Sequence, residues 1–129
     1  MSEAILSRWY AAIKAGDPAA LADIAAPDVV VRWNGPHGLI PWAGEHCGVD
    51  AVLAFFRSVA EHLEVLSVEP VEKLEGDGKT LIVLAGHWRV RSNGRELKLR
   101  AANLFTFRAG KVAAYEVFPD SASFAAALA

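Results

Sequence analysis

The stretch that decides the fold is LKLRAANLFTF, residues 97–107, in which two kinds of side chain alternate. The odd positions form a mainly apolar row, whereas the even positions include Lys98, Arg100 and Thr106. A period of two is typical of a β-strand with one buried and one exposed face. Asn103 lies in the middle of the apolar row, and an unpaired buried amide costs roughly 1–3 kcal/mol. Asn103 therefore needs a polar partner, either another group of the protein or a ligand.

The second half of the chain repeats this pattern between turn residues. We expect strands at about 64–74, 80–91, 96–107 and 112–118, with a tight type I′ hairpin at Asn93-Gly94. These four strands form an antiparallel meander.

The strand at 80–91 carries two distinct rows. One row is apolar throughout, and Gly86 in it leaves room for a ring, so that Trp88 is a candidate for lining a pocket. The opposite row, from Leu81 to Arg91, begins apolar and ends basic. A half-apolar outer face is more than a monomer usually leaves exposed. We therefore expect a homodimer that forms through this face.

The first half of the chain is mainly helical. A helix ends before Gly16, Asp17 caps a second helix, and Asp50 is expected to cap a third. A β-branched strand at 29–33 precedes the segment 34–48, which is rich in glycine and rings and is interpreted as a loop that lines a site. Helices followed by a meander predict an α+β fold in which helices cover one face of a strongly curved antiparallel sheet.

Composition excludes several classes of protein. The 129 residues suffice for one domain, and 13 basic against 15 acidic residues without a basic run argue against nucleic acid as a partner. No signal peptide or membrane span is predicted. The single Cys47 fits the reducing cytoplasm. The four histidines lack metal-ligand spacing, and we expect neither a metal nor a cofactor.

Several strings of the sequence resemble a known family. AIKAGDPAALADIAAPDVVVRW, GEHCGVDAVLAFFRSV, ANLFTFRAGKVAAYEVF and PDSASFAAAL together cover nearly all of residues 1–129. They are similar to the SnoaL-like and ketosteroid isomerase-like branch of the nuclear transport factor 2-like superfamily. The resemblance implies a single domain with a cystatin-like, cone-shaped barrel, an apolar pocket and dimerisation through the outer sheet face.

The resemblance to ketosteroid isomerases also implies positions for a site. The proton-shuttling carboxylate would fall on Asn34, which cannot accept a proton near neutral pH. The oxyanion-hole tyrosine would fall on Trp9, while the adjacent Tyr10 is expected to face elsewhere. The protonated aspartic acid would fall on Asn103, whose amide can still donate to an oxyanion. The resemblance therefore implies that a hydrogen-bond donor for the oxyanion is retained at Asn103, whereas the carboxylate base of the isomerases is absent at Asn34.

Two further residues are candidates for proton transfer. SnoaL-like cyclases place an acid–base aspartate near the end of the last strand, where this chain has Asp120. Asp120 also precedes a helix start, so its carboxylate can serve as an N-cap instead. His46 lies at the entry to the third helix, where it either relays a proton or is an ordinary loop histidine.

The sequence thus leaves three functions open. The first is a cofactor-independent isomerase, cyclase or dehydratase for a compact apolar molecule with a carbonyl or hydroxyl group, with Asp120, Asn103 and His46 as catalytic residues. The second is a non-catalytic protein that binds such a molecule, and the third is a dimeric interaction domain. The residues expected to line the pocket are Trp9, Asn34, Phe55, Trp88, Leu99 and Tyr115.

Overall fold

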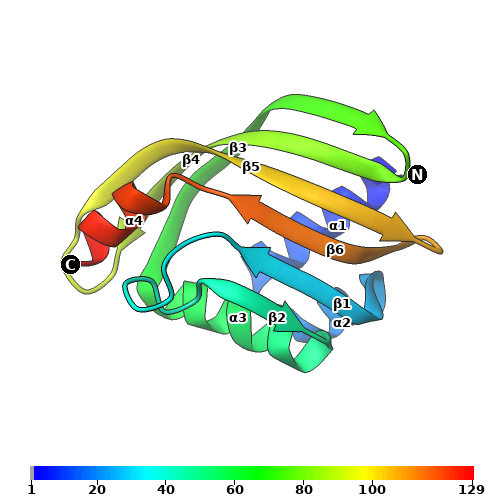
Figure 1. Ribbon diagram of the computed structural model, residues 1–129, viewed down its shortest axis with the longest axis horizontal. Helices are drawn as coiled ribbons and strands as arrows, with labels where there is room; N and C mark the ends of the chain where they lie inside the picture. The colour runs from blue at the N-terminus through cyan, green and yellow to red at the C-terminus, as the bar shows by residue number, and fades with distance from the viewer. Residues whose placement is uncertain (1) are drawn as a thin grey trace.

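The computed structural model describes residues 2–129 as four helices around one six-stranded sheet (Figure 1). The α+β class is confirmed, while Met1 of the predicted domain 1–129 lies outside the described residues. Within residues 2–129, no helix is both long and apolar enough to cross a membrane. The elements are α1 (Ser2–Ala15), α2 (Pro18–Ile24), β1 (Ala25–Trp33), β2 (Gly44–Cys47), α3 (Val49–His62), β3 (Leu63–Gly76), β4 (Lys79–Val90), β5 (Glu96–Arg108), β6 (Lys111–Phe118) and α4 (Ser121–Leu128).

The start of α2 follows the capping rules, whereas the start of α3 does not. The Asp17 carboxylate caps α2 by accepting a hydrogen bond from the backbone N–H of Ala20 at 3.1 Å. The prediction that Asp50 caps α3 is wrong, because Gly48 is the N-cap, with a φ of 86° that favours glycine. Asp50 lies in the first turn instead, where its charge faces the positive end of the helix dipole.

The strand order is β2-β1-β6-β5-β4-β3, and every neighbouring pair is antiparallel except β1 and β6, which run parallel. The prediction of a loop over residues 34–48 is wrong for Gly44–Cys47, which form β2 at one edge of the sheet. Glu45 pairs with Arg32 of β1 across this edge. Four residues are too few for a period of two to be recognised in the sequence.

The type I′ geometry occurs at other turns than the predicted Asn93-Gly94. Both central residues have a positive φ at Asp77-Gly78 (50° and 71°) and at Ala109-Gly110 (52° and 75°), as a type I′ turn requires. The type I′ prediction for Asn93-Gly94 is wrong, because only Gly94 has a positive φ there. The Asn93 side chain instead donates to the carbonyl oxygen of Ala127 in α4.

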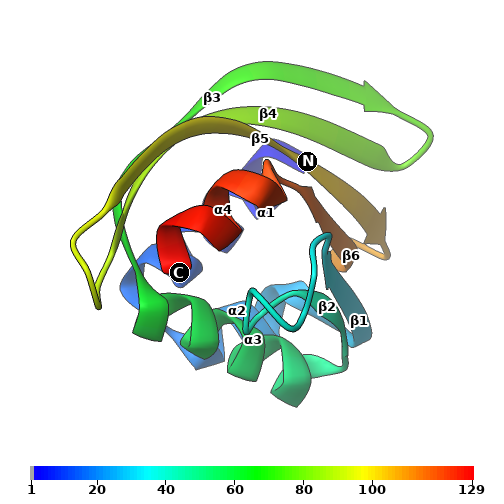
Figure 2. The same cartoon turned by 60° about the vertical axis from the view of Figure 1, so that its left-hand side comes forward.

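The sheet is open and strongly curved, as expected for a cone. Figure 2 shows α1 and α4 on its concave side, with α2 and α3 beside its β1–β2 end. Irregularities in the β3–β4 register, between Val65 and Ser67 and between Pro70 and Glu72, are bulges of the kind that bend a strand. The core lies between the concave face and the helices and is rich in aromatic rings.

Candidate functional site

The apolar row that first defined β5 is buried, and Asn103 belongs to it. The Asn103 side chain is only 2% exposed, and Ala101 and Phe105 on either side of it are also buried. Across the sheet, Asn103 is paired with Ile82 of β4 and Val117 of β6, which are both in the core. A single amide is thus enclosed by apolar neighbours on the inner face of the sheet.

The partner of Asn103 is Tyr10 of α1. The amide nitrogen of Asn103 donates a hydrogen bond of 2.9 Å to the Tyr10 hydroxyl oxygen. The expectation that Tyr10 faces elsewhere is wrong, because α1 lies over the sheet so that the rings of both Trp9 and Tyr10 contact Phe105, at 6.0 and 5.9 Å. Of these two aromatic residues, Tyr10 is the one that hydrogen-bonds to Asn103. The indole of Trp9 is fully buried in the core.

The two tyrosines of the inner face are neutral donors. Burial raises the pKa of Tyr10 from 10.0 to about 12, although the hydrogen bond from Asn103 opposes part of this shift. Burial also raises the pKa of Tyr115 well above 10.0, and the nearby Tyr10 adds to the effect. Within residues 3–129, neither hydroxyl donates its hydrogen to a protein acceptor. Both phenols can therefore donate to an oxygen atom of a ligand.

His46 offers a base on the same face of the sheet. Its Nε2 atom lies 2.9 Å from the carbonyl oxygen of Trp42, which can only accept, so Nε2 carries the hydrogen and Nδ1 carries the lone pair. The imidazole packs on Phe55 of α3 with 4.9 Å between ring centroids. Across the strands, His46 is paired with Val31, and Val31 with Tyr115. His46 and Tyr115 therefore belong to one row.

Asp120 is the N-cap of α4. Its carboxylate accepts a hydrogen bond from the hydroxyl of Ser123 at 2.8 Å and another from the Ser123 backbone N–H at 3.2 Å. These bonds hold the pKa of Asp120 below its ordinary value of 3.8, so the group is ionised at neutral pH. A catalytic role for this exposed carboxylate stays a prediction.

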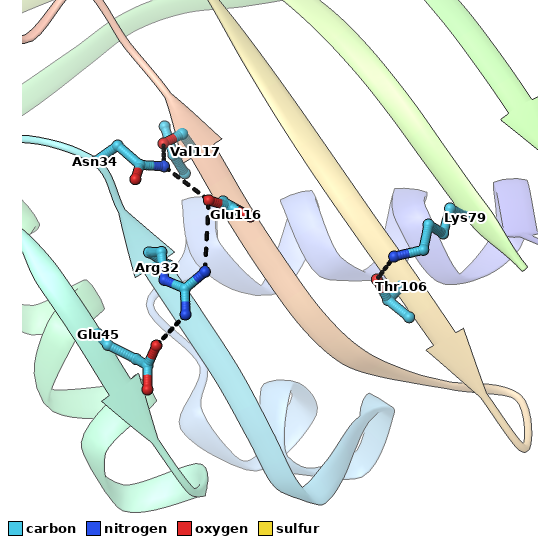
Figure 3. A network of polar contacts seen from close by, with 7 residues as sticks. All are labelled: Arg32, Asn34, Glu45, Lys79, Thr106, Glu116 and Val117. Carbon is cyan, nitrogen blue, oxygen red and sulfur yellow. Dashed lines mark hydrogen bonds and ion pairs between the residues drawn. The ribbon is translucent and has the colours of Figure 1, made fainter.

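Asn34 belongs to a polar network between β1, β2 and β6 (Figure 3). Its amide nitrogen donates to the Glu116 carboxylate at 3.0 Å and to the carbonyl oxygen of Val117 at 2.9 Å. The guanidinium of Arg32 joins Glu116 to Glu45. The amide at the isomerase base position is thus bonded to the protein, and its role toward a substrate stays a prediction.

Trp88 occupies the space that Gly86 leaves free. A Cβ atom at position 86 would lie 2.0 Å from Cη2 of Trp88, so the indole lies directly over the glycine. Leu99, opposite Gly86 on β5, contributes to an open groove of about 610 Å³ across β3, β4 and β5. The groove is lined by Ser67, Glu69, Ala85, Gly86, His87, Lys98, Leu99 and Arg100.

Apart from Asn103, which is bonded to Tyr10, the predicted site residues fall into two groups. The aromatic contacts bring Trp9, Phe55 and Tyr115 together through Phe56, and His46 joins them through Phe55. Asp120, Asn34, Trp88 and Leu99 have their contacts elsewhere. Among the described residues, no three His, Cys, Asp or Glu side chains form a group that could hold a metal ion.

Sequence reasoning missed Tyr10 as a site residue. The available signal was two adjacent aromatic residues, Trp9 and Tyr10, on an amphipathic helix. Two neighbours on a helix diverge by about 100° around its axis, and a broad apolar face can include both. The register of α1 over the sheet decides which ring meets Asn103.

Comparison with known proteins supports this fold. The sequence profile of the SnoaL-like domain matches residues 6–115. An NTF2-like protein from Burkholderia xenovorans is 27% identical, with a TM-score of 0.87, over 97% of this chain and 93% of that one. A candidate isomerase from Rhodopseudomonas palustris is 20% identical, with a TM-score of 0.84, over 94% and 93% of the two chains.

A candidate SnoaL-like polyketide cyclase from Mesorhizobium loti is similar in fold, with a TM-score of 0.70 and 15% identity over 92% of this chain and 99% of that one. A search of curated proteins found no match. The residues matched by the profile make up most of the sequence and run from α1 into β6. The chain therefore belongs to the SnoaL-like domain family.

Proposed function

We propose that this protein is an acid–base enzyme for a compact, largely apolar molecule that carries a carbonyl or hydroxyl group. The observation that supports this function best is the Asn103–Tyr10 hydrogen bond in an otherwise apolar interior. A hydroxyl that accepts one hydrogen bond becomes a stronger donor for the next. Tyr10, oriented by Asn103, is therefore a suitable donor to a carbonyl oxygen that becomes negative during the reaction.

The reaction we propose begins with removal of a proton from the carbon next to the carbonyl group. Nδ1 of His46 takes this proton, the electron pair of the C–H bond forms a carbon–carbon double bond, and the π electron pair of the carbonyl group moves to its oxygen, which accepts hydrogen bonds from Tyr10 and Tyr115. In this proposal a compact molecule lies between the side chains of His46 and Tyr115, which are separated by two strand spacings, about 10 Å between their Cα atoms.

The enolate so formed has three possible fates. Reprotonation at another carbon gives isomerisation, attack on an electrophilic carbon of the same molecule gives cyclisation, and loss of a β-hydroxide gives dehydration. Isomerase and polyketide cyclase are the descriptions carried by the R. palustris and M. loti proteins of similar fold. Proton removal is common to all three reactions and can therefore be tested without the natural substrate.

The proposed proton removal predicts hydrogen–deuterium exchange next to a carbonyl group. In D₂O, the protein should accelerate exchange in cyclohexanone, 1-indanone or 1-tetralone, as followed by proton NMR. Replacing Tyr10 with phenylalanine should slow this exchange roughly 10²–10³-fold, the usual effect of removing one oxyanion donor. Asn103→Leu should also slow it, because the tyrosine loses its orienting partner.

The control is Ser7→Ala, which removes a hydroxyl group from the exposed face of the same helix and should leave the rate unchanged. An undiminished rate in Tyr10→Phe would contradict the proposed donor. Binding of the ketones without any exchange by the wild-type protein would contradict the enzyme and favour a ligand-binding protein of the same fold.

We also propose that two copies of the chain associate through the outer face of the sheet. Leu74, Leu81 and Leu104 lie side by side across three strands, and Leu74 is 68% exposed. In the adjacent row, Val83 of β4 and Phe118 of β6 lie on either side of β5, and Phe118 is 45% exposed. Such a continuous apolar area is typical of a surface that is covered by a partner.

The proposed dimer should dissociate when a charge is placed in this apolar area. Phe118→Glu is expected to shift the protein from dimer to monomer in sedimentation equilibrium at micromolar concentration, because a carboxylate would have to be buried without a partner. The control is Leu39→Glu in the loop before β2, where the leucine is 64% exposed. A monomeric wild-type protein would contradict the proposed interface.

The cytoplasm remains the location that we propose. Cys47 is exposed and has no disulfide partner among the described residues. A free surface thiol suits a reducing compartment.

A further inference from the structure

The open groove across β3, β4 and β5 lies on the outer face of the sheet, and we call it the outer groove. Residues that are paired across neighbouring strands share a face. Two such rows, in the order β3, β4, β5, line the groove: Ser67, His87 and Lys98, and Glu69, Ala85 and Arg100. The core residues Ile82 and Leu84 belong to the other face of β4. Figure 2 shows α1 and α4 on that concave side. The outer groove is therefore separate from the aromatic interior.

The β5 wall of the outer groove carries two cations. Lys98 and Arg100 are both exposed, and they lie two residues apart on one face of the strand, about 7 Å between their Cα atoms. Within residues 2–129, neither side chain makes an ion pair or a hydrogen bond. Two positive charges held side by side repel each other, and an anion that contacts both removes this repulsion. This wall therefore suits the two oxygen atoms of a carboxylate.

The neighbouring acidic residues of this face are already bonded to other cations. Glu96 precedes Lys98 on the same face of β5, but its carboxylate lies 2.5 Å from Nε2 of His87 and 3.8 Å from the guanidinium of Arg89. Glu64 of β3 is also bonded to Arg89, at 3.1 Å. The charges of Arg89, Glu64 and Glu96 are thus balanced within the protein. Lys98 has no such counter-ion among the described residues, although it lies beside this network.

The β3 wall of the outer groove carries the opposite charge. Ser67 and Glu69 are exposed and lie between the two bulges of the β3–β4 register, and bulges re-aim side chains next to functional sites. In the part of the chain that the structure describes, neither side chain is hydrogen-bonded. Glu69 is separated from Arg100 by two strand spacings, about 10 Å between their Cα atoms, and the two side chains form no ion pair. A molecule with a negative and a positive end can therefore contact both walls.

We propose that the outer groove binds a small zwitterion, which carries a carboxylate at one end and an ammonium group at the other. Lys98 and Arg100 donate hydrogen bonds to the carboxylate, and the ammonium group donates to Glu69 and Ser67. Ala85 forms the floor between the walls, where its single methyl group leaves room for the carbon chain of the ligand. A simple anion satisfies only the β5 wall, because the carboxylate of Glu69 repels a second negative charge. This binding is independent of the reaction that we propose for the inner face.

The test compares 4-aminobutyrate with butyrate, which has the same carbon chain and carboxylate but no ammonium group. In a proton–nitrogen NMR titration of the wild-type protein at low ionic strength, 4-aminobutyrate should bind about 2- to 5-fold more tightly than butyrate. It should shift the amide signals of Ser67, Glu69, Lys98 and Arg100, and added sodium chloride should weaken the binding. Equal affinity for the two molecules would overturn the ammonium contact. No binding of 4-aminobutyrate, or shifts confined to other parts of the chain, would overturn the site.

Substitutions in the two walls should have different effects. Lys98→Ala and Arg100→Ala should each weaken the binding of both molecules about 2- to 5-fold, the effect of one exposed ion pair. Glu69→Gln keeps the shape of the side chain, so it should weaken only 4-aminobutyrate and bind butyrate at least as tightly as the wild type. The control is Lys111→Ala, an exposed lysine of β6 outside the groove, which should change neither affinity. Unchanged affinity in Lys98→Ala or Arg100→Ala would overturn the paired cations, and equal losses for both molecules in Glu69→Gln would overturn the ammonium contact.

Two further measurements separate this site from the functions proposed above. The outer groove lies beside the apolar area of the proposed dimer, since Ala85 follows Val83 on the same face of β4. All the groups that contact the ligand belong to one chain, so its dissociation constant should be the same at every protein concentration. A dissociation constant that varied with protein concentration would overturn a site within one chain. Tyr10→Phe should bind 4-aminobutyrate as the wild type does, and loss of binding there would overturn the placement of the ligand on the outer face.

Discussion

Replacement of Trp9 by alanine is expected to lower the free energy of unfolding by about 3–5 kcal/mol, the range found for large aromatic residues removed from a core. Trp9 is completely buried, and its indole contacts Phe56, Phe105 and Tyr115 at 5.8, 6.0 and 5.3 Å. These rings belong to α3, β5 and β6, so the vacated space lies where four elements meet. The cavity could not collapse without moving the sheet against both helices.

Urea denaturation followed by circular dichroism measures this loss. Domains of this size are stable by only about 5–15 kcal/mol, so the variant should unfold at a much lower urea concentration. Trp9→Phe is the matched control, because it keeps a ring and removes an indole N–H that has no acceptor among the described residues. The loss in Trp9→Phe should be clearly smaller. Equal stability of Trp9→Ala and the wild type would contradict a core role for this residue.

Replacement of His46 by alanine is expected to slow the ketone exchange reaction in D₂O by roughly 10²–10⁴-fold, the usual contribution of a general base. We assign the role of base to Nδ1 of His46. This atom carries the lone pair, because Nε2 donates its hydrogen to the carbonyl oxygen of Trp42. The fold should persist, because the hydrogen bonds between β1 and β2 use backbone atoms. Proton NMR of the ketone measures the rate.

The control for this prediction is a second histidine, whose ring also lies within hydrogen-bond distance of a backbone carbonyl oxygen. Nδ1 of His37 lies 2.9 Å from the carbonyl oxygen of Ala43 in the exposed loop before β2, and His37→Ala should exchange ketones at the wild-type rate. If His46→Ala retained full activity, another group would have to be the base. Asp120 would then be examined by Asp120→Asn, since asparagine preserves the N-cap but cannot accept a proton.

Much of the fold could be predicted because it depends on local patterns. The alternation in 97–107, the cap at Asp17 and the Pro18 that follows it each follow from the chemistry of a few neighbouring residues. The strand Gly44–Cys47 could not be predicted in this way, because it is defined by its hydrogen bonds to β1 rather than by a pattern of its own. The turn at Asn93-Gly94 differs from expectation for a similar reason, since Asn93 is bonded to α4.

In the candidate site, too, local features could be predicted from the sequence, whereas contacts between distant residues could not. The sequence indicated that the buried Asn103 needs a polar partner, because the cost of an unpaired amide is independent of the fold. It could not indicate that the partner is Tyr10, 93 residues away, because that depends on the angle of α1 over the sheet. The cap role of Asp120 was predictable, since it involves only Ser123, three residues along the chain.

The amino-acid sequence by itself therefore determined the α+β class, most of the helices and strands, and the presence of one amide in an apolar row. These properties arise from periodicity and from contacts between residues a few positions apart. Only the tertiary structure decided that Tyr10 and Tyr115 share the inner face with Asn103, and that Phe124 lies among three tryptophans. The physical reason is that helix orientation and sheet curvature are set by packing of the whole chain, which no short window of sequence contains.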